Sequence, residues 1–147
     1  MKAGLKLKIL SIGFIFLCLW ACKEQATQPL QSDPYARWKH FGYQNYTFDQ
    51  TRTCYCINGG EAMRVTVRSD TVSNVMRLSD SSMLSPADSR SYLTIDSLFG
   101  LIHAAKFDSV VIRYHATYGY TERLDIDPQA HPWDGGVLYV SANLRVP

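Results

Sequence analysis

The sequence of 147 residues has no long hydrophobic run and no excess of basic charge beyond its N-terminal segment. An apolar stretch at Ile9–Leu19 has only 11 residues, whereas a membrane-spanning helix needs about 20. Without Lys2, Lys6 and Lys8, the chain carries 12 basic and 13 acidic residues, a net charge of −1. Such a near-neutral chain offers no electrostatic footprint to nucleic acid, so we expect no nucleic-acid partner.

The sequence also lacks the signatures of familiar catalytic sites. It contains no Gly-x-Ser-x-Gly elbow, no glycine-rich phosphate loop and no His-Glu-x-x-His motif. The sequence therefore specifies no reaction and no cofactor. Whether the protein is an enzyme stays open, and we favour a protein that is not an enzyme. The content of 46% hydrophobic and 12% aromatic residues nevertheless predicts an ordinary packed core.

The N-terminal segment has the organisation of a signal peptide: basic residues, a short apolar region and then small residues. Its end, Leu19-Trp20-Ala21-Cys22, is similar to a bacterial lipobox. The resemblance implies that cleavage removes residues 1–21 and that Cys22 carries diacylglycerol and an N-acyl chain, which anchor it at about 0.8 kcal/mol per buried methylene. We expect a cell-envelope lipoprotein. An aspartate directly after the acylated cysteine would favour retention in the inner membrane, and because Lys23 stands there instead, we expect the outer membrane. A plain secretory signal with a coincidental cysteine is the alternative.

The remaining chain divides into a tether and one domain. Residues 22–33 are mostly polar and show no apolar periodicity, which predicts a flexible tether. Residues 34–147 contain no repeat, no low-complexity segment and no second linker, which favours a single domain.

The periodicity of that domain predicts the order α-β-β-β-α-β-β-β. Asp33-Pro34 begins a short helix, and alternating residues predict three strands within 46–78 and three within 110–144. Thr94 caps a longer amphipathic helix that has Lys106 in its last turn. We therefore predict a two-layer α+β domain, in which an antiparallel sheet of about six strands is covered by one long amphipathic helix.

Four elements of the domain together resemble a known family. They are Asn45-Tyr46-Thr47-Phe48, Arg52-Thr53-Cys54-Tyr55-Cys56, Thr94-Ile95-Asp96-Ser97-Leu98-Phe99, and Tyr114 with Tyr118-Gly119-Tyr120. The family is the bacterial domain of unknown function 6174, found mostly in small secreted proteins and lipoproteins, and the resemblance spans about 38–144. It implies a context and an architecture, and it implies no chemistry.

Cys54 and Cys56 are the candidate reactive pair, because Cys18 leaves with the signal peptide and Cys22 is acylated. Alternation places both on one face of a strand, with Cα atoms about 6.5–7 Å apart. This is the upper limit for a disulfide, so a bridge requires a bulge or a local turn. Three roles stay open: a purely structural role, a thiol-redox role and a metal site. An oxidising cell envelope would not normally leave two such thiols unused.

The other polar candidates give weaker signals. A metal site would need a histidine, yet no histidine stands at a ligand spacing from the cysteines or from another histidine. The four histidines are His40, His103, His115 and His131. Asp125 and Asp127 resemble the start of a calcium loop, but Ala130 and Gly136 occupy positions that such a loop reserves for glycine and glutamate. We expect these aspartates to form a solvated strand face.

Binding is the function that we favour. Arg52, predicted on the face of the two cysteines, either pairs with a buried carboxylate such as Asp96 or contacts a ligand. Tyr118, Tyr120 and Trp133 lie in or beside connections, where large aromatic side chains form a binding platform or cap the edge of the core. We predict a non-catalytic binding module that contacts an envelope protein or a small ligand through these three aromatic residues. The alternative is a thiol-redox or metal-binding protein that acts through the cysteine pair.

Overall fold

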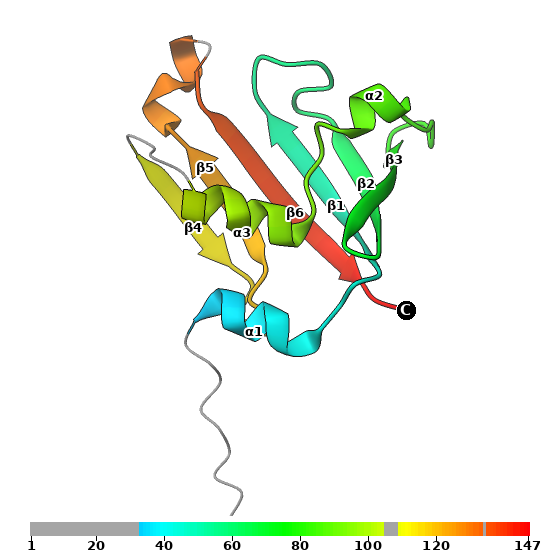
Figure 1. Cartoon of the computed structure of the whole chain (residues 1–147). Coiled ribbons are helices and arrows are strands. Elements are labelled where there is room, and N and C mark those ends of the chain that lie inside the picture. The colour runs from blue at the N-terminus through cyan, green and yellow to red at the C-terminus, as the bar shows by residue number, and fades with distance from the viewer. Residues whose placement is uncertain (1–32, 105–108, 134) are drawn as a thin grey trace, which may run out of the picture.

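The chain folds around one antiparallel sheet of six strands (Figure 1). A computed structural model describes residues 33–104, 109–133 and 135–147, apart from the side chains of residues 132 and 133. The strands are β1 (Tyr46–Thr53), β2 (Ala62–Arg68), β3 (Thr71–Arg77), β4 (Val110–Tyr114), β5 (Thr121–Ile126) and β6 (Val137–Arg145). Their order, β3-β2-β1-β6-β5-β4, joins two three-stranded meanders where β1 pairs with β6.

The helices are short. They are α1 (Pro34–Phe41), α2 (Pro86–Ser89), α3 (Ile95–Ala104) and the 3-10 helix η1 (Pro128–Trp133). The carboxylate of Asp33 accepts from the backbone N–H groups of Tyr35 and Ala36, so α1 begins where the sequence predicts. It ends at Gly42, which adopts the left-handed conformation with φ of 61°. None of the helices within the described residues is long and apolar enough to cross a membrane.

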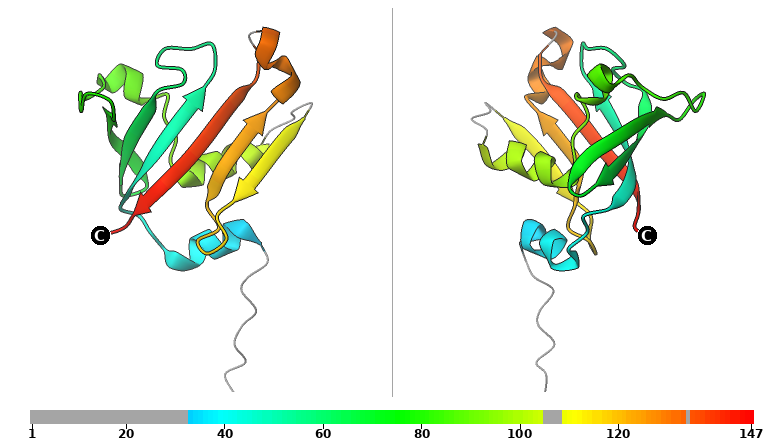
Figure 2. Two further views of the ribbon diagram at one scale, coloured as in Figure 1. Left: turned by 180° about the vertical axis from the view of Figure 1, so that it is seen from behind. Right: turned by 45° about the vertical axis from the view of Figure 1, so that its right-hand side comes forward.

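The predicted covering layer is wrong. Instead of one long amphipathic helix, α3 has 10 residues within the described chain, a length of about 15 Å, whereas six strands extend roughly 24 Å across a sheet. A helix of this length therefore covers only part of one face, and α1 closes the lower end of the molecule instead (Figure 1). Seen from behind, the other face of the sheet carries no described helix (Figure 2). Lys106, predicted in the last helical turn, lies outside the described residues.

The core lies between α3 and the sheet. Alternate residues of the strands face this layer, and α3 inserts Ile95 and Phe99 into one buried cluster and Leu98 into a second. Each fully buried side chain of this size contributes about 1.5–3 kcal/mol. The buried partners in the larger cluster are Trp38, Tyr46, Phe48, Met63, Val65, Val67, Val75, Tyr92 and Tyr120.

Two buried polar side chains of β1 fix the chain that enters α3. Gln50 is fully buried; its amide donates to the Leu93 carbonyl and accepts from the Leu93 N–H, both at 3.2 Å. The hydroxyl of Tyr46 accepts from the first N–H of the helix, that of Ile95, at 3.1 Å, and burial raises the pKa of Tyr46 far above its ordinary value. Both strand residues thus satisfy backbone groups that the core would otherwise leave unpaired.

The uncovered face of the sheet carries a buried carboxylate. Asp49 accepts from Arg64 Nε at 2.9 Å and from Asn143 Nδ2 at 2.8 Å. Burial opposes ionisation of this group, but the hydrogen bonds from Arg64 and Asn143 outweigh it and hold the pKa of Asp49 below its ordinary value. Charge on this face is therefore paired across neighbouring strands.

Candidate functional site

The two cysteines lie in the loop between β1 and β2, residues 54–61, which we call the tip loop. A disulfide joins Cys54 to Cys56 with Cα atoms 5.3 Å apart, closer than the 6.5–7 Å or so of an extended strand. The expectation that both continue the strand is therefore wrong, because β1 ends at Thr53. The expectation that a bridge requires a turn is confirmed, since Cys56 N–H donates to the Cys54 carbonyl at 2.9 Å.

Backbone hydrogen bonds close the rest of the tip loop. Gly60 N–H donates to the Arg52 carbonyl at 2.8 Å, and Gly59 N–H donates to the Cys56 carbonyl at 3.0 Å. A Cβ atom at Gly59 would lie 2.3 Å from the Cys54 carbonyl oxygen, so only glycine fits there. Residues Asn58, Gly59 and Gly60 form a turn that folds back onto the disulfide.

Arg77 of β3 holds the tip loop from the side. Its Nη2 donates to Asn58 Oδ1 at 3.0 Å and its Nη1 donates to Ser82 Oγ at 2.9 Å. The same guanidinium forms an ion pair with Glu61 at the end of the loop. The side chain of Arg77 therefore fixes the loop to the sheet in addition to the two strand ends.

This closed loop exposes two large apolar side chains. Tyr55 is 90% exposed and Ile57 is 74% exposed, the highest values among the exposed large hydrophobic side chains of the described chain. Alternation through Cys54 and Cys56 predicts a strand here and does not indicate that Tyr55 and Ile57 are exposed on a loop. The available signal was the cysteine spacing, because a bridge that forces a turn also forces the residue between the cysteines outward.

Arg52 lies beneath the tip loop and does not pair with Asp96. Its Nη1 donates to the Ser91 carbonyl at 3.0 Å, its Nη2 donates to the Ile57 carbonyl at 3.1 Å, and its guanidinium carbon lies 5.3 Å from the centre of the Tyr92 ring. Asp96 instead binds the α1 side chains, accepting from Lys39 at 3.0 Å and from Trp38 Nε1 at 3.2 Å. The predicted pair of Arg52 with Asp96 is therefore wrong.

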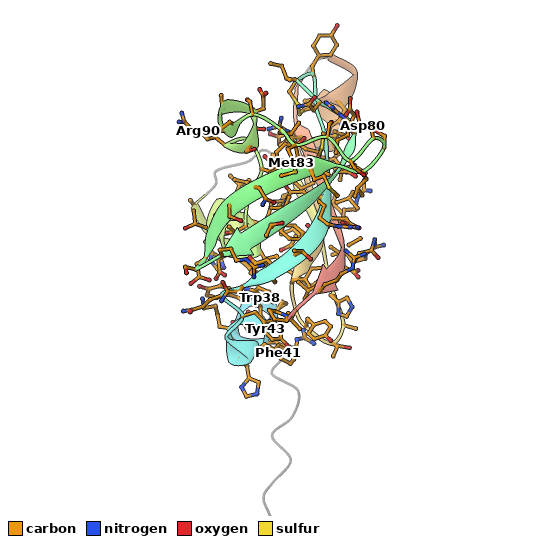
Figure 3. All side chains as sticks on the ribbon, turned by 90° about the vertical axis from the view of Figure 1, so that its right-hand side faces the viewer. Trp38, Phe41, Tyr43, Asp80, Met83 and Arg90 are labelled. Atoms are coloured by element: carbon orange, nitrogen blue, oxygen red, sulfur yellow. A yellow bond between two sulfur atoms is a disulfide. The ribbon has the colours of Figure 1, made fainter. Side chains whose placement is uncertain are left out.

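Two cavities flank α2. One, of about 280 Å³, lies at the tip loop and is lined by Arg52, Ile57, Asn58, Ala87, Asp88 and Ser91. The other, of about 530 Å³, lies along the start of β3 and is lined by Thr71, Val72, Ser73, Asn74, Leu84, Pro86, Ser89, Arg90 and Tyr92. Figure 3 looks onto the β3 side, where Met83 lies toward the same end as Arg90 and Asp80. Met83 pairs with Met76 of β3 in an isolated bridge, which covers that part of the edge.

The backbone places two of the three aromatic residues predicted as a contact surface before one end of β5 and the third after its other end. Tyr118 and Tyr120 stack with ring centres 6.5 Å apart just before β5, whereas η1, which ends at Trp133, follows the other end of that strand. Tyr120 is only 4% exposed and packs in the core. The side chain of Trp133 lies outside the described residues, as does Cys22. Figure 3 shows Trp38, Phe41 and Tyr43 at the end of the molecule formed by α1, and Tyr118 packs on Phe41 at 5.1 Å.

The histidines serve separate contacts. His115 Nδ1 accepts from the N–H groups of Thr117 and Tyr118 at 3.2 Å, so this side chain orders the turn before β5. His131 Nε2 lies 3.0 Å from a carboxylate oxygen of Asp125. Within the described chain, no three potential metal-ligating side chains lie together.

Asp125 is buried, which contradicts the predicted solvated face. Its carboxylate accepts from Arg123 Nη2 at 2.6 Å, and η1 brings His131 beside it. Asp127 accepts from the Ser109 N–H at 2.9 Å, which ties the start of β4 to the end of β5. Alternation placed Asp125 on the uncovered face, but it could not show that η1 brings His131 to within 3.0 Å of its carboxylate.

Comparison with known proteins identifies a family and no individual relative. Neither the curated proteins nor the solved structures yield a match. A family model described as "Family of unknown function (DUF6174)" matches residues 32–146, which include every described element of the sheet. The chain therefore belongs to the DUF6174 family.

Proposed function

We propose that this protein is a lipid-anchored binding module of the bacterial cell envelope, which contacts a protein partner through Tyr55 and Ile57 of the tip loop. The observation that carries the proposal is the near-complete exposure of these two apolar side chains on a closed loop. Large aromatic and aliphatic side chains dominate binding energy at protein interfaces. A loop that is already ordered also loses less conformational entropy when it binds.

The place of the tip loop favours a partner away from the anchoring membrane. The described domain begins at Asp33 beside α1, whereas the tip loop lies at the opposite end of the sheet (Figure 1). In this proposal Cys22 carries the lipid chains, in the outer membrane, and residues 22–33 reach at most about 40 Å when fully extended. An anchor at the α1 end leaves the tip loop free for a protein in the envelope.

Site-specific photo-cross-linking tests the proposal. A photoreactive phenylalanine derivative replaces Tyr55 in the full-length protein, in the cells that make it, and a second strain carries it at Met83. Met83 is 56% exposed and lies outside the tip loop, so it reports random collisions. We expect a discrete product from position 55, absent from position 83 and lost when Ile57→Asp is added. Equal products from both positions, or none from position 55, would reject the tip loop as the contact surface.

The anchor is tested separately. The mass of the N-terminal peptide of the purified protein should exceed that of an unmodified Cys22 peptide by a diacylglycerol and an acyl group. A Cys22→Ser variant should lose this mass and should leave the membrane fraction. A mature N-terminus at any other residue would contradict the lipoprotein proposal and would leave the tip-loop contact to be judged by cross-linking alone.

The disulfide favours one second candidate, thiol–disulfide exchange. Cys56 is exposed and Cys54 is half-buried, so in the dithiol form Cys56 is the sulfur that a substrate disulfide reaches. Its thiolate would attack that disulfide and release one substrate thiolate. The Cys54 thiolate would then attack the Cys56 sulfur and release the other, so that two electrons pass to the substrate. A dithiol reductant in the envelope must return the pair to its reduced form.

Equilibration with glutathione buffers decides this candidate. A reduction potential between about −120 and −270 mV, the range of dithiol oxidoreductases, together with turnover of a disulfide substrate, would support it. A potential below about −300 mV is typical of structural disulfides and would reject it.

A further inference from the structure

We infer that the cavity beneath the tip loop binds a carboxylate of the partner through the guanidinium group of Arg52. This inference deepens the proposed binding function by naming the chemistry of the partner beside the apolar contact. It rests on the charge of Arg52, on the cavity that this side chain lines and on the donors that remain free there.

Arg52 is a half-buried cation without a counter-ion among the described residues. Its two terminal nitrogens donate to the carbonyl groups of Ser91 and Ile57, and carbonyl groups do not neutralise its charge. Its Nε is buried and has no acceptor among the described residues. A cation that has lost water without gaining a carboxylate is costly, and an anion that enters the site removes part of that cost.

The cavity offers a second donor. Asn58 Oδ1 already accepts from Arg77, which leaves the NH2 group of Asn58 for the space that this residue lines. Ser91 is not free in this way, because its hydroxyl donates to the Asp88 carbonyl at 2.7 Å. Asp88 lies on the rim, and its carboxylate accepts from the Ser85 hydroxyl at 2.7 Å.

The walls and the volume restrict the ligand. Ile57 and Ala87 line the same cavity, so an apolar group can lie beside the bound carboxylate. About 280 Å³ is just below the usual size of a pocket for a drug-sized molecule, and this space suits one side chain or chain terminus. A planar guanidinium recognises a carboxylate by charge-assisted hydrogen bonds. The chemistry is therefore a peptide carboxylate next to an apolar residue, supplied by an acidic side chain or by a C-terminus.

Nuclear magnetic resonance of the full-length protein in detergent micelles tests this site with two pairs of peptides. One pair is acetyl-leucyl-aspartate amide and acetyl-leucyl-asparagine amide, and the other is acetyl-glycyl-leucine with a free or an amidated C-terminus. We expect the carboxylate member of at least one pair to shift the side-chain N–H signals of Arg52 and Asn58. The amide member should bind roughly tenfold more weakly or worse. The pair that responds identifies the source of the carboxylate.

The molecule contains its own control. Arg37 is also half-buried and donates to a carbonyl group, that of Ala116 at 2.7 Å, and its Nε likewise has no described acceptor. It lines neither cavity beside α2, so its signal should not move. Shifts of equal size at Arg37 and Arg52, equal binding of both members of each pair, or no shift at all would overturn the inference.

A second variant leaves Arg52 in place, so that a lost response cannot be caused by unfolding after removal of this side chain. Ala87→Glu, at an exposed position on the rim, supplies a carboxylate within the protein and should abolish the response while the melting temperature stays unchanged. If the peptides still shift the signals of Arg52 and Asn58 fully in this variant, that result would also contradict the carboxylate site. Cross-linking from Tyr55 does not depend on these peptides. If cross-linking succeeds and the peptides fail, only the carboxylate site is rejected; the reverse result rejects only the tip-loop contact.

Discussion

Reduction of the Cys54–Cys56 disulfide should destabilise the protein only slightly. The bridge closes a loop of three residues, and in the chain-entropy account such a loop stabilises the folded state by about 1.6 kcal/mol, against about 3 kcal/mol for a 15-residue loop. For the 114 residues from Pro34 to Pro147, this loss corresponds to a decrease in melting temperature of about 7 °C. The double variant Cys54→Ser, Cys56→Ser should show the same decrease.

The structure explains why the fold should survive. The tip loop lies beyond the end of β1, and its sulfur atoms belong to neither buried cluster. The hydrogen bond from Gly60 to Arg52 and the contact of Arg77 with Asn58 do not depend on the bridge. We therefore expect the sheet to remain folded while the segment from Cys54 to Ile57 gains mobility.

Urea denaturation with and without a phosphine reductant measures the loss, and hydrogen exchange locates it. The slope of the unfolding free energy against urea should not change, because the same core is exposed on unfolding. Protection should fall most in the tip loop, and the slowest-exchanging amides of α3 should lose no more than the roughly 15-fold that a global loss of about 1.6 kcal/mol produces. A loss above about 4 kcal/mol, or a loss of protection in the sheet well beyond that roughly 15-fold change, would show that the bridge holds the core, which would refute the reasoning that confines its contacts to the tip loop.

Three further predictions concern the sheet and the tip loop. Gln50→Leu should lower the free energy of unfolding by roughly 2–4 kcal/mol, because the buried N–H and C=O groups of Leu93 lose their partners; a change below 1 kcal/mol or so in urea titrations would contradict this. Burial opposes the charge of Asp49, but the hydrogen bond from Arg64 outweighs this effect, so the pKa of Asp49 lies below its ordinary value. The ionised carboxylate therefore makes its full contribution to the free energy of unfolding above about pH 4, and this contribution is lost as the pH falls through the lowered pKa. In Arg64→Gln, thermal melts should lose part of this acid dependence. Tyr55→Ser should change stability by less than about 0.5 kcal/mol in the same melts, since the side chain is exposed.

Local signals in the sequence were enough to find many boundaries of the fold. Asp33 caps α1, and the N–H of Ser97 donates to Thr94 Oγ1 at 3.0 Å at the start of α3. Each signal acts within a few residues, through one side chain and one backbone group. The covering of the sheet is a different kind of property, because it depends on how far an apolar stripe extends in space. The stripe around Phe99 continues too briefly to make a layer.

The alternating pattern of the sequence does not predict contacts between side chains that are far apart in the chain. Nothing near Arg52 in the sequence indicates that the carbonyl of Ser91 will accept from it, or that Lys39 will take Asp96 instead. The same limit applies to Tyr120, which alternation and its place in a connection could not distinguish from an exposed residue. The fold packs Tyr120 into the core cluster, with the ring centres of His115 at 4.8 Å and Trp38 at 6.4 Å.

At the tip loop, the geometry of a disulfide predicts the end of the strand better than the alternating pattern does. An alternating pattern continues through Cys54 and Cys56, but an extended strand holds their Cα atoms too far apart for a bridge. If the pair is oxidised, the strand must end before it, and Tyr55 must then project from a turn. Burying a side chain of this size contributes about 1.5–3 kcal/mol, and the bridged turn forgoes that stabilisation at both Tyr55 and Ile57. Exposed apolar groups on an ordered loop gain their stabilisation only when another surface covers them, which is why we propose this loop as the contact surface.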